Sequence, residues 1–368
     1  MKRLMLFLFC CICLVQCADN KKIVGTWINR NDFVDAEITR FYDDYFVFVS
    51  PYSGEEHEEK FAYSIVKDSV YLSILWDIAA YKLVVKKDSL EFIYNEKEAS
   101  LYVERYQDKN ILDFFNRKYE QHIQLPELEL YEFNYRRSIQ PSVLFVSYQG
   151  DTAKLFYNGT ALPIDTLLHS KFVSYPDSDK LTIQNVCFFD TRTPYSIVRL
   201  LKKELAKASL TKVKYVTVDA ENKLCELTNH LTPLEDFFFS KRGFYFFFEI
   251  YENKILNNGR AISIEELNEM FVKAIEAFPY SSCEFYVDDE TSYGYYLYVL
   301  NAIRQVYDNA RNEYAKQQYG VTDYRSIEDE DILSDIRWNI PMNFKELWNK
   351  ENVLGDFLVI DEDSESYQ

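Results

Sequence analysis

Two aspartates occupy matched positions in the second half of the chain. Asp190 and Asp288 each end a strand-like run, and each precedes a tyrosine by five residues. A carboxylate acts as a general acid or base when a His, a Cys or a second carboxylate is positioned beside it. Neither aspartate is accompanied by such a group, and the four histidines are scattered singly. We therefore predict no catalytic residue and interpret both aspartates as N-caps of the helices that follow.

Cofactor and metal sites have no better support in the sequence. The acidic runs Asp288–Glu290 and Glu328–Asp331 lack the alternating ligands and the turn glycine of a calcium loop, so they are interpreted as solvated surface. Beyond the first seventeen residues there is no Cys-x-x-Cys pair, and the chain has no glycine-rich phosphate loop and no serine-nucleophile elbow. The prediction is a protein that is not an enzyme and that uses neither a metal nor a cofactor.

The composition favours several β-rich domains with an acidic surface. The 368 residues are 48% hydrophobic and 17% aromatic, with 30 Tyr and 28 Phe against only 9 Gly. Tyr and Phe suit the half-buried surface of a sheet, and the length exceeds that of one ordinary domain. The net charge of −18, from 59 acidic and 41 basic residues, argues against nucleic acid as a partner.

The first residues have the pattern of a secretion signal. Lys2 and Arg3 precede an apolar run that ends Leu14-Val15-Gln16-Cys17, and this run is too short to span a bilayer. The ending resembles the lipobox of bacterial lipoproteins of the kind found in Bacteroidota, although Gln16 departs from the usual small residue. The resemblance implies a signal peptide over residues 1–16, lipidation of Cys17 and a tether over residues 17–21. The alternative is a plain signal peptide with incidental cysteines.

Removal of such a leader leaves three cysteines in the folded part: Cys187, Cys225 and Cys283. Three thiols can form at most one disulfide, and whether two of them pair stays open. Cys187 and Cys283 lie in strand-like runs, so we predict that both are buried structural residues.

Residues 22–106 contain eight short β-like runs separated by polar breaks at hairpin distances. This spacing predicts an antiparallel meander that closes into a barrel and so hides its edges. Gly25-Thr26-Trp27 on the first run resembles the Gly-x-Trp start of lipocalin-like domains, which implies a barrel that binds a small apolar ligand. The many large aromatic residues could instead fill so small a barrel, and we interpret Trp27 as a core residue.

Two segments of the second half repeat. Phe156–Leu168 is echoed by Leu256–Asn268 at a shift of 100, including an Asn-Gly pair, and Phe188–Leu201 is echoed by Tyr286–Val299 at a shift of 98. Each copy predicts a strand, an Asn-Gly turn, a helix, a strand ending in Asp and a second helix. A closing strand is predicted over residues 211–218, whereas residues 319–322 are a poor substitute in the second copy.

This order of elements resembles the periplasmic domain of the ExbD/TolR family. The resemblance implies two α+β units, at residues 140–220 and 242–322. Around them we expect a helical linker over 107–139, a linker over 221–241 and an acidic tail over 323–368 that contains a short helix from Ile327 to Trp338. Domains of this family dimerise and engage protein partners or the cell wall, so the two copies could pair within the chain. The family's membrane helix with its embedded Asp is not matched, which puts a proton-driven motor role in doubt.

The fold class predicted is therefore an N-terminal lipocalin-like barrel followed by two ExbD/TolR-like α+β domains. The function predicted is scaffolding by a non-enzymatic envelope lipoprotein, associated with TonB-type transport. Its partners would be envelope proteins or the cell wall, with the lipid anchor in the periplasmic face or the outer membrane of a Gram-negative bacterium. The alternative is a carrier of a small apolar ligand. A large cavity in the barrel favours the carrier, and a filled barrel with an exposed edge strand in the repeats favours the scaffold.

Overall fold

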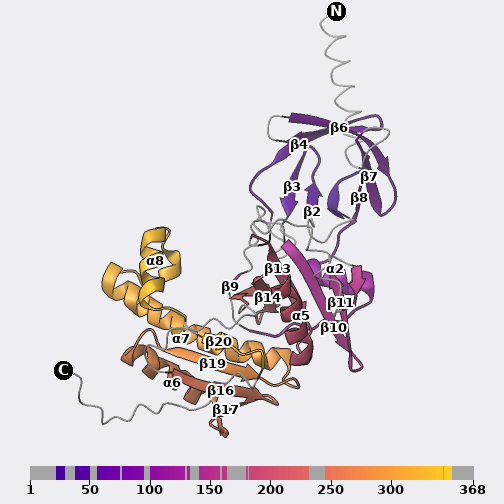
Figure 1. Cartoon of the computed structure of the whole chain (residues 1–368). Helices are drawn as coiled ribbons and strands as arrows, with labels where there is room; N and C mark the ends of the chain where they lie inside the picture. Colours follow the sequence, from indigo (N-terminus) through magenta and orange to yellow (C-terminus); the bar gives the residue numbers. More distant parts are fainter. Residues whose placement is uncertain are drawn as a thin grey trace, which may run out of the picture.

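The chain folds into a barrel and two sheets that lie in a row (Figure 1). The computed structural model describes residues 22–29, 38–49, 56–74, 77–94, 100–128, 131–132, 141–157, 160–163, 180, 182–231, 245–342 and 344–349. The predicted leader, Cys17 and the tether at residues 17–21 lie outside these ranges, as does the acidic end of the chain. Of the helices in the described part, none has the combination of length and apolar character needed to cross a membrane.

The eight strands predicted for residues 22–106 are confirmed, and they form a closed antiparallel barrel. The barrel closes because β1 pairs with β2 on one side and with β8 on the other. Such an architecture is compatible with a lipocalin-like domain. The strands are β1 (Gly25–Asn29), β2 (Ile38–Phe41), β3 (Tyr45–Val49), β4 (Phe61–Val66), β5 (Ser69–Ile74), β6 (Asp77–Val85), β7 (Ser89–Ile93) and β8 (Ser100–Arg105).

Aromatic side chains fill the barrel. The ring of Phe41 lies 5.3 Å from that of Phe46 and 5.2 Å from that of Tyr63, measured between centroids. Trp27 is only 1% exposed, and its indole N–H donates to the carbonyl of Ile23 at 2.7 Å. The interpretation of Trp27 as a core residue is therefore confirmed.

A short helix, α2 (Ile111–Tyr119), joins the barrel to the first sheet and confirms the helical part of the predicted linker. Asn110 caps it by accepting from the backbone N–H of Asp113 at 2.9 Å. Phe115 of this helix stacks on Phe145 of the sheet with centroids 3.9 Å apart. The same apolar cluster includes residues from the outside of β1, β2 and β3, so barrel, helix and sheet share one core.

The first sheet has seven strands in the order β12-β11-β10-β13-β14-β15-β9. β10 pairs in parallel with β13, and β13 with β14, while the other neighbours are antiparallel. Helix α5 (Tyr195–Lys207) and strand β14 (Lys212–Val218) match the helix and closing strand predicted there. The remaining strands are β9 (Tyr131–Glu132), β10 (Pro141–Gln149), β11 (Thr152–Tyr157), β12 (Thr160–Leu162), β13 (Gln184–Phe189) and β15 (Leu224–His230).

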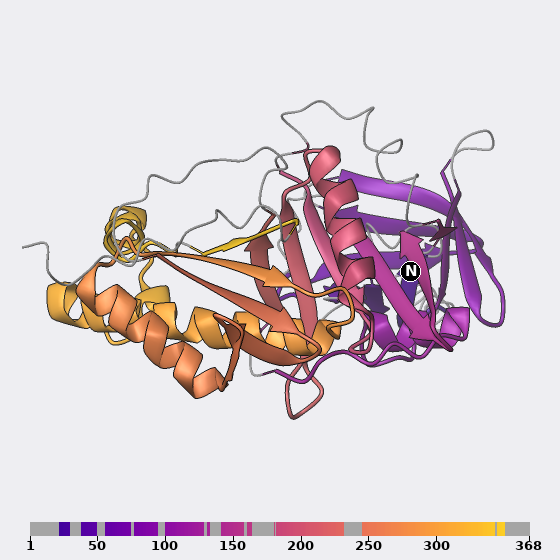
Figure 2. The ribbon, with the colours of Figure 1, turned by 60° about the horizontal axis from the view of Figure 1, so that its bottom comes forward.

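The second sheet repeats that plan with five strands in the order β18-β17-β16-β19-β20. Helix α7 (Tyr293–Tyr319) runs along it, as Figure 2 shows in orange and yellow. The strands are β16 (Tyr245–Tyr251), β17 (Lys254–Asn257), β18 (Arg260–Ile262), β19 (Ser282–Val287) and β20 (Phe344–Glu346). The other helices are α6 (Ile264–Ala277), the 3-10 turn η1 (Tyr324–Ser326) and α8 (Glu330–Asn339).

The Asn-Gly turn is confirmed in the second unit. Asn258 and Gly259 both have positive φ, 51° and 74°, which is the left-handed backbone that a two-residue hairpin requires. Ser263 then caps α6 in a capping box with Glu266. The first unit's Asn158-Gly159 pair and the helix predicted after Pro163 lie outside the described residues.

Two of the predicted segment boundaries differ from the structure. Residues 221–241, predicted to be a linker, contain β15, which pairs along its whole length with β14. Residues 323–368, predicted to be an acidic tail with one short helix, contain that helix as α8 but also the turn η1 and the strand β20. β20 supplies the closing strand that residues 319–322 could not, because it pairs in parallel with β19 where β14 pairs with β13 in the first unit.

Candidate functional site

The two repeat units meet where α5 and α7 begin, and their backbones exchange hydrogen bonds in reciprocal pairs. The N–H of Tyr195 donates to the carbonyl of Thr291 at 2.8 Å, and the N–H of Tyr293 donates to that of Thr193 at 2.9 Å. A second pair of 3.0 Å bonds runs from Ser196 N–H to Asp289 O and from Gly294 N–H to Thr191 O. The residues of each pair are related by the shift of 98, so the units are related by an approximate twofold axis.

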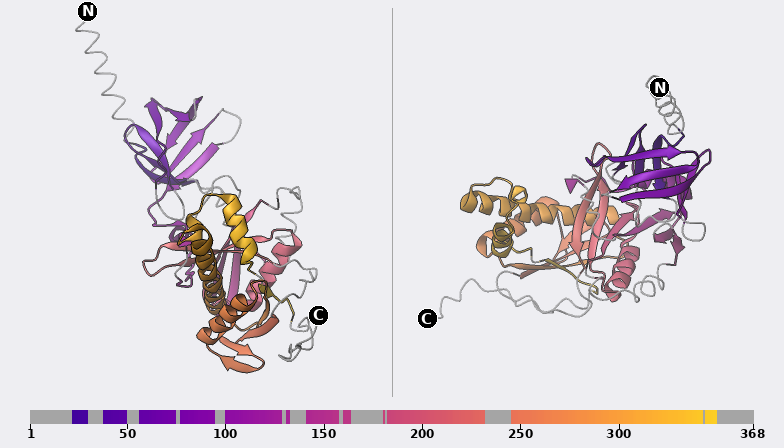
Figure 3. Two further views of the ribbon diagram at one scale, coloured as in Figure 1. Left: turned by 90° about the vertical axis from the view of Figure 1, so that its left-hand side faces the viewer. Right: turned by 90° about the horizontal axis from the view of Figure 1, so that it is seen from above.

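A single apolar core extends through this interface. One cluster of buried residues includes Val198 and Leu201 of α5, Leu297 and Val299 of α7, and strand residues of both sheets. The two further views in Figure 3 place the second unit directly against the first, on the side away from the barrel. We call the contact between α5 and the second unit the inter-unit interface.

The aspartates singled out in the sequence lie beside this interface, but they do not cap the helices. The N-cap of α5 is Pro194, and that of α7 is Ser292. The Asp190 carboxylate is fully buried, and it accepts from the backbone N–H groups of Arg192 and Gln124 and from the Arg192 guanidinium. The N-cap interpretation is wrong because a further turn separates each strand from its helix.

Asp288 closes the equivalent turn in the second unit by accepting from the backbone N–H of Glu290 at 3.0 Å. Each aspartate therefore holds the turn that leads from its strand to the interface. Their bonds are structural, since the partners are backbone N–H groups and an arginine, with no His or Cys among them.

A buried polar network lies in the inter-unit interface. The Lys202 ammonium donates to Glu346 Oε2 at 2.5 Å and to the hydroxyls of Tyr195 and Tyr296, both at 3.0 Å. Tyr195 also donates to Glu346. Lys202 is only 3% exposed, so this cation has been transferred from water into the protein with a single carboxylate as its countercharge.

Burial governs the ionisation of this network. It lowers the pKa of Lys202, an effect that the Glu346 carboxylate opposes. Burial raises the pKa of both Tyr195 and Tyr296 well above 10, and the neighbouring carboxylate raises it further. At neutral pH both hydroxyls therefore remain protonated and can serve as hydrogen-bond donors and acceptors.

The approximate twofold axis relates this network to an apolar set on the other side. Tyr293 and Leu300 lie 98 positions after Tyr195 and Lys202 and are their equivalents in the second unit. Tyr215 occupies on β14 the register position that Glu346 occupies on β20. The Tyr293 ring lies 4.7 Å from that of Phe189 and 6.0 Å from that of Tyr215, and its hydroxyl has no hydrogen-bond partner in the described part of the chain. The backbone is thus symmetric across the interface, while the side-chain chemistry is not.

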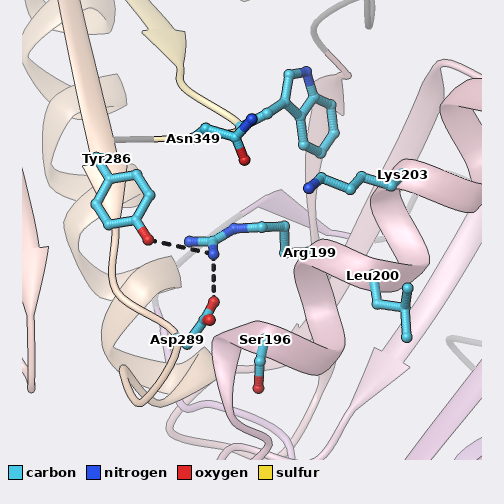
Figure 4. Close-up of a pocket in the computed structure, with 8 residues that line it drawn as sticks. Ser196, Arg199, Leu200, Lys203, Tyr286, Asp289 and Asn349 are labelled. Carbon is cyan, nitrogen blue, oxygen red and sulfur yellow. Dashed lines mark hydrogen bonds and ion pairs between the residues drawn. The ribbon is translucent and has the colours of Figure 1, made fainter. Parts of the chain in front are cut away.

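A pocket of about 660 Å³ opens at the outer end of the interface (Figure 4). Arg199 of α5 reaches across it, donates to Asp289 and to the carbonyl of Val287, and lies with its guanidinium 4.9 Å from the ring centroid of Tyr286. Figure 4 shows the Lys203 side chain extending into the same space. The lining residues are Ser196, Arg199, Leu200, Lys203, Tyr286, Asp289, Trp348 and Asn349.

The chemistry of this pocket suits binding. Arg199 is only 8% exposed, and its Nε and the indole Nε1 of Trp348 are buried donors without a hydrogen-bond partner among the described residues. Buried donors of this kind favour a ligand or partner that brings acceptor oxygens. Among the lining side chains there is no His or Cys to pair with the Ser196 hydroxyl, so this set does not form an activated nucleophile.

Other predicted site residues are placed as follows. Cys187, Cys225 and Cys283 are buried and are not joined in a disulfide, and the burial predicted for the first and third is thereby confirmed. Cys17, the predicted lipidation site, lies outside the described residues. Within the described ranges, no three His, Cys, Asp or Glu side chains gather into a metal site.

The sequence does not predict the contact between Lys202 and Glu346, because the two residues are 144 positions apart and no motif links them. One local signal was present. Lys202 follows Val198 by four residues and precedes Leu205 by three, so it occupies the apolar stripe of an amphipathic helix. A lysine in such a stripe indicates a buried partner of opposite charge.

Comparison with known proteins adds no family to these observations. The chain matches no protein-family model and none of the curated proteins.

The two equivalent tyrosines should respond in opposite ways to loss of the hydroxyl. We expect Tyr293→Phe to leave stability at pH 7 unchanged or raised by about 1 kcal/mol, since it removes a buried hydroxyl that lacks a partner. Tyr195→Phe should cost about 1–2 kcal/mol, because Lys202 and Glu346 each lose a partner. Urea unfolding of both variants measures the difference, and equal effects would contradict the assigned contacts.

The same tyrosines predict how stability depends on alkaline pH. A folded-state pKa above 10 means that the folded chain holds the proton longer than the unfolded chain. The hydroxyls of Tyr195, Tyr293 and Tyr296 therefore make their full contribution to the free energy of unfolding below pH 10. This contribution is lost as the pH rises from 10 towards their folded-state pKa values. Each group contributes a slope of about 1.4 kcal/mol per pH unit there. Urea midpoints between pH 8 and 11.5 should fall less steeply in Tyr293→Phe than in the wild type.

Proposed function

We propose that this chain is a non-enzymatic, lipid-anchored protein of the cell envelope that binds extended segments of partner proteins through its two repeat units. The leader ending at Cys17 supports the anchor, and the resemblance of the repeats to ExbD/TolR domains supports an envelope complex of the TonB-transport type. The proposed partners are envelope proteins or the cell wall, both of which ExbD/TolR domains engage.

The observation that carries this proposal is a pair of equivalent edge strands. β12 and β18 each end their sheets, and no described strand pairs with their outer edges. Ala161 and Ala261 are both exposed and stand at the same place in the two hairpins. In a hairpin closed by two residues, the pair next to the turn exchanges both of its hydrogen bonds inward. The N–H and carbonyl of the following residue, Ala161 or Ala261, therefore face outward and are available to an added strand.

The alternative, a carrier of an apolar molecule, is less well supported. The barrel interior holds Trp27 and a set of packed Phe and Tyr rings with centroids 5–6 Å apart. A carrier of the lipocalin type needs that space for its ligand.

Proline at the two edge positions should weaken partner binding. In Ala161→Pro/Ala261→Pro each outward N–H is lost while the hairpin bonds are kept, because proline is tolerated on an edge where the N–H faces solvent. We expect affinity for the partner to fall about two- to tenfold for each edge. Ala161→Thr/Ala261→Thr, which keeps both N–H groups, is the control. The measurement is capture of envelope proteins by the tagged chain, with mass spectrometry and then titration of what is recovered. Recovery of no specific protein by the wild type, or equal binding by the Pro and Thr variants, would overturn the proposal.

The anchor is tested separately. We expect Cys17→Ser to move the protein from the detergent phase to the aqueous phase in a phase-partition experiment and to prevent incorporation of labelled fatty acid. Lys22 lies beyond the predicted tether, and Lys22→Ser should change neither result. An unlabelled wild-type protein would show that the leader is a plain signal peptide.

A further inference from the structure

A second cavity, of about 510 Å³, is lined by residues of both units and shares none of them with the pocket that contains Arg199. Its wall includes β15 of the first unit, helices α7 and α8, and β20 of the second. Three arginines line it, Arg304 and Arg311 from α7 and Arg337 from α8. No acidic side chain is among the lining residues that are described.

The three guanidinium groups are only partly satisfied by the protein. Arg304 donates through Nη1 to the carbonyl of Thr228 at 3.0 Å, but its buried Nε has no hydrogen-bond partner in the described structure. Arg311, only 9% exposed, donates through Nε to the carbonyl of Ile340. Both anchors are backbone carbonyls, which orient a guanidinium without neutralising it.

The carboxylates that interact with these arginines are shared with other cations. Glu226, which interacts with Arg304, is paired with Lys214 at 2.8 Å. Asp308 lies 3.9 Å from Arg304 Nε, but it also accepts from Tyr324 at 2.8 Å and pairs with Arg325. Burial raises the pKa of Asp308, while Tyr324, Arg304 and Arg311 lower it. The acidic partner of Arg337 within the described part of the chain is Glu330, which lies at 3.9 Å and is 83% exposed. A surplus of positive charge at this cavity stands out in a chain of net charge −18.

Apart from the arginines and Thr228, the described lining residues are apolar. Leu227 of β15, Leu300 of α7 and Phe344 of β20 contribute to the lining. A cavity of this volume, with apolar walls and a few convergent polar groups, has the usual character of a small-molecule site. Guanidinium groups bind planar carboxylates and phosphates through two parallel hydrogen bonds.

We propose that this cavity binds a small amphiphilic anion, with a carboxylate or phosphate head held by Arg304, Arg311 and Arg337 and an apolar portion against Leu227, Leu300 and Phe344. The orphaned Nε of Arg304 gains an acceptor when the anion binds. The site lies away from the edges of β12 and β18, so it is independent of the proposed partner binding.

The test is calorimetric titration of the full chain with octanoate and octyl phosphate, beside two control probes, inorganic phosphate and octyltrimethylammonium. We expect saturable one-to-one binding of at least one octyl anion, and the tighter of the two identifies the head group. Arg337→Gln should weaken it about tenfold or more. Because its side chain is half exposed, this variant should fold normally. Lys273→Gln removes a positive charge from an exposed site on α6 that lines neither pocket, and it should leave the affinity unchanged.

Absence of saturable binding by either octyl anion would overturn the proposal. Equal loss of affinity in Arg337→Gln and Lys273→Gln would overturn it too, since only the net charge of the protein would then matter. Binding of octyltrimethylammonium as tight as that of the anions would exclude the guanidinium head site, and binding of inorganic phosphate as tight as that of octyl phosphate would exclude the apolar part. Arg304→Lys, which keeps the charge but loses the fork of donors, should bind more weakly than the wild type.

Discussion

Replacing Glu346 by glutamine should destabilise the chain by about 3–5 kcal/mol, the cost of leaving a buried charge without its partner. Lys202 would keep the hydroxyls of Tyr195 and Tyr296, but it would lose the carboxylate 2.5 Å from its ammonium. The lysine is 3% exposed, so water cannot take the place of the lost charge. The free energy of unfolding from urea titration measures the effect.

Removing both charges together should cost much less. We expect Lys202→Met/Glu346→Gln to recover most of the lost stability, because the pair is replaced by groups that need no countercharge. An exposed ion pair, Lys273 with Glu269 at 3.8 Å, gives the matched control, and Lys273→Met should cost no more than about 0.5 kcal/mol. A double variant as unstable as Glu346→Gln alone would show that the two charges do not depend on each other.

The variant Glu346→Gln should regain part of its lost stability at alkaline pH. The folded-state pKa of Lys202 lies below the 10.5 of an unperturbed lysine, and loss of Glu346 should lower it further. Between the folded value and 10.5 the unfolded chain binds more protons, so the stability contribution of Lys202 rises with pH in that window. The deficit of Glu346→Gln relative to the wild type should therefore shrink as the pH approaches 10.

Trp27→Ala should destabilise the barrel by about 3–5 kcal/mol, since it removes the largest buried side chain of that core and leaves a cavity. Trp27 also bonds to the Ile23 carbonyl and lies under the Arg105 guanidinium, 4.7 Å from the ring centroid. Ile78, 73% exposed on β6, is the control, and Ile78→Ala should change stability by less than about 0.5 kcal/mol.

The cavity left by Trp27→Ala should bind indole. Apolar cavities of this kind take up ligands of matching shape, so added indole should raise the unfolding temperature of the variant and not that of the wild type. A rise in the unfolding temperature of the wild type with indole would support the carrier function. A wild-type barrel that is itself stabilised by indole would have room for a ligand beside Trp27.

The elements that the sequence predicted well are those in which local pattern and final environment agree. Phe61–Val66 alternates buried and exposed residues along β4, which a two-residue period detects directly. Asn258-Gly259 marked its hairpin because few other pairs adopt positive φ at both positions. The apolar stripe of α5 has the period of an amphipathic helix, and it predicted a helix at this place.

The elements that were missed depend on contacts far along the chain. β20 is a three-residue strand, Phe344–Glu346, with no alternation of its own, and pairing with β19 stabilises it. β15 includes Glu226, Thr228 and Asn229, and this polar composition is typical of a linker. The segment forms a strand because it pairs with β14. The site was missed for the same reason, since Lys202 and Glu346 meet only when both units have folded.

The reciprocal bonds between Thr193 and Tyr293 and between Thr291 and Tyr195 also have a consequence for stoichiometry. A dimer of two separate chains dissociates on dilution, but these two halves are joined covalently and stay paired at any concentration. One lipid anchor would then carry two binding edges in a fixed geometry, and a partner that presents two matching segments could engage both without a second copy of this protein. Since the interface is closed within one chain, its symmetry gives no means of growing into a longer assembly.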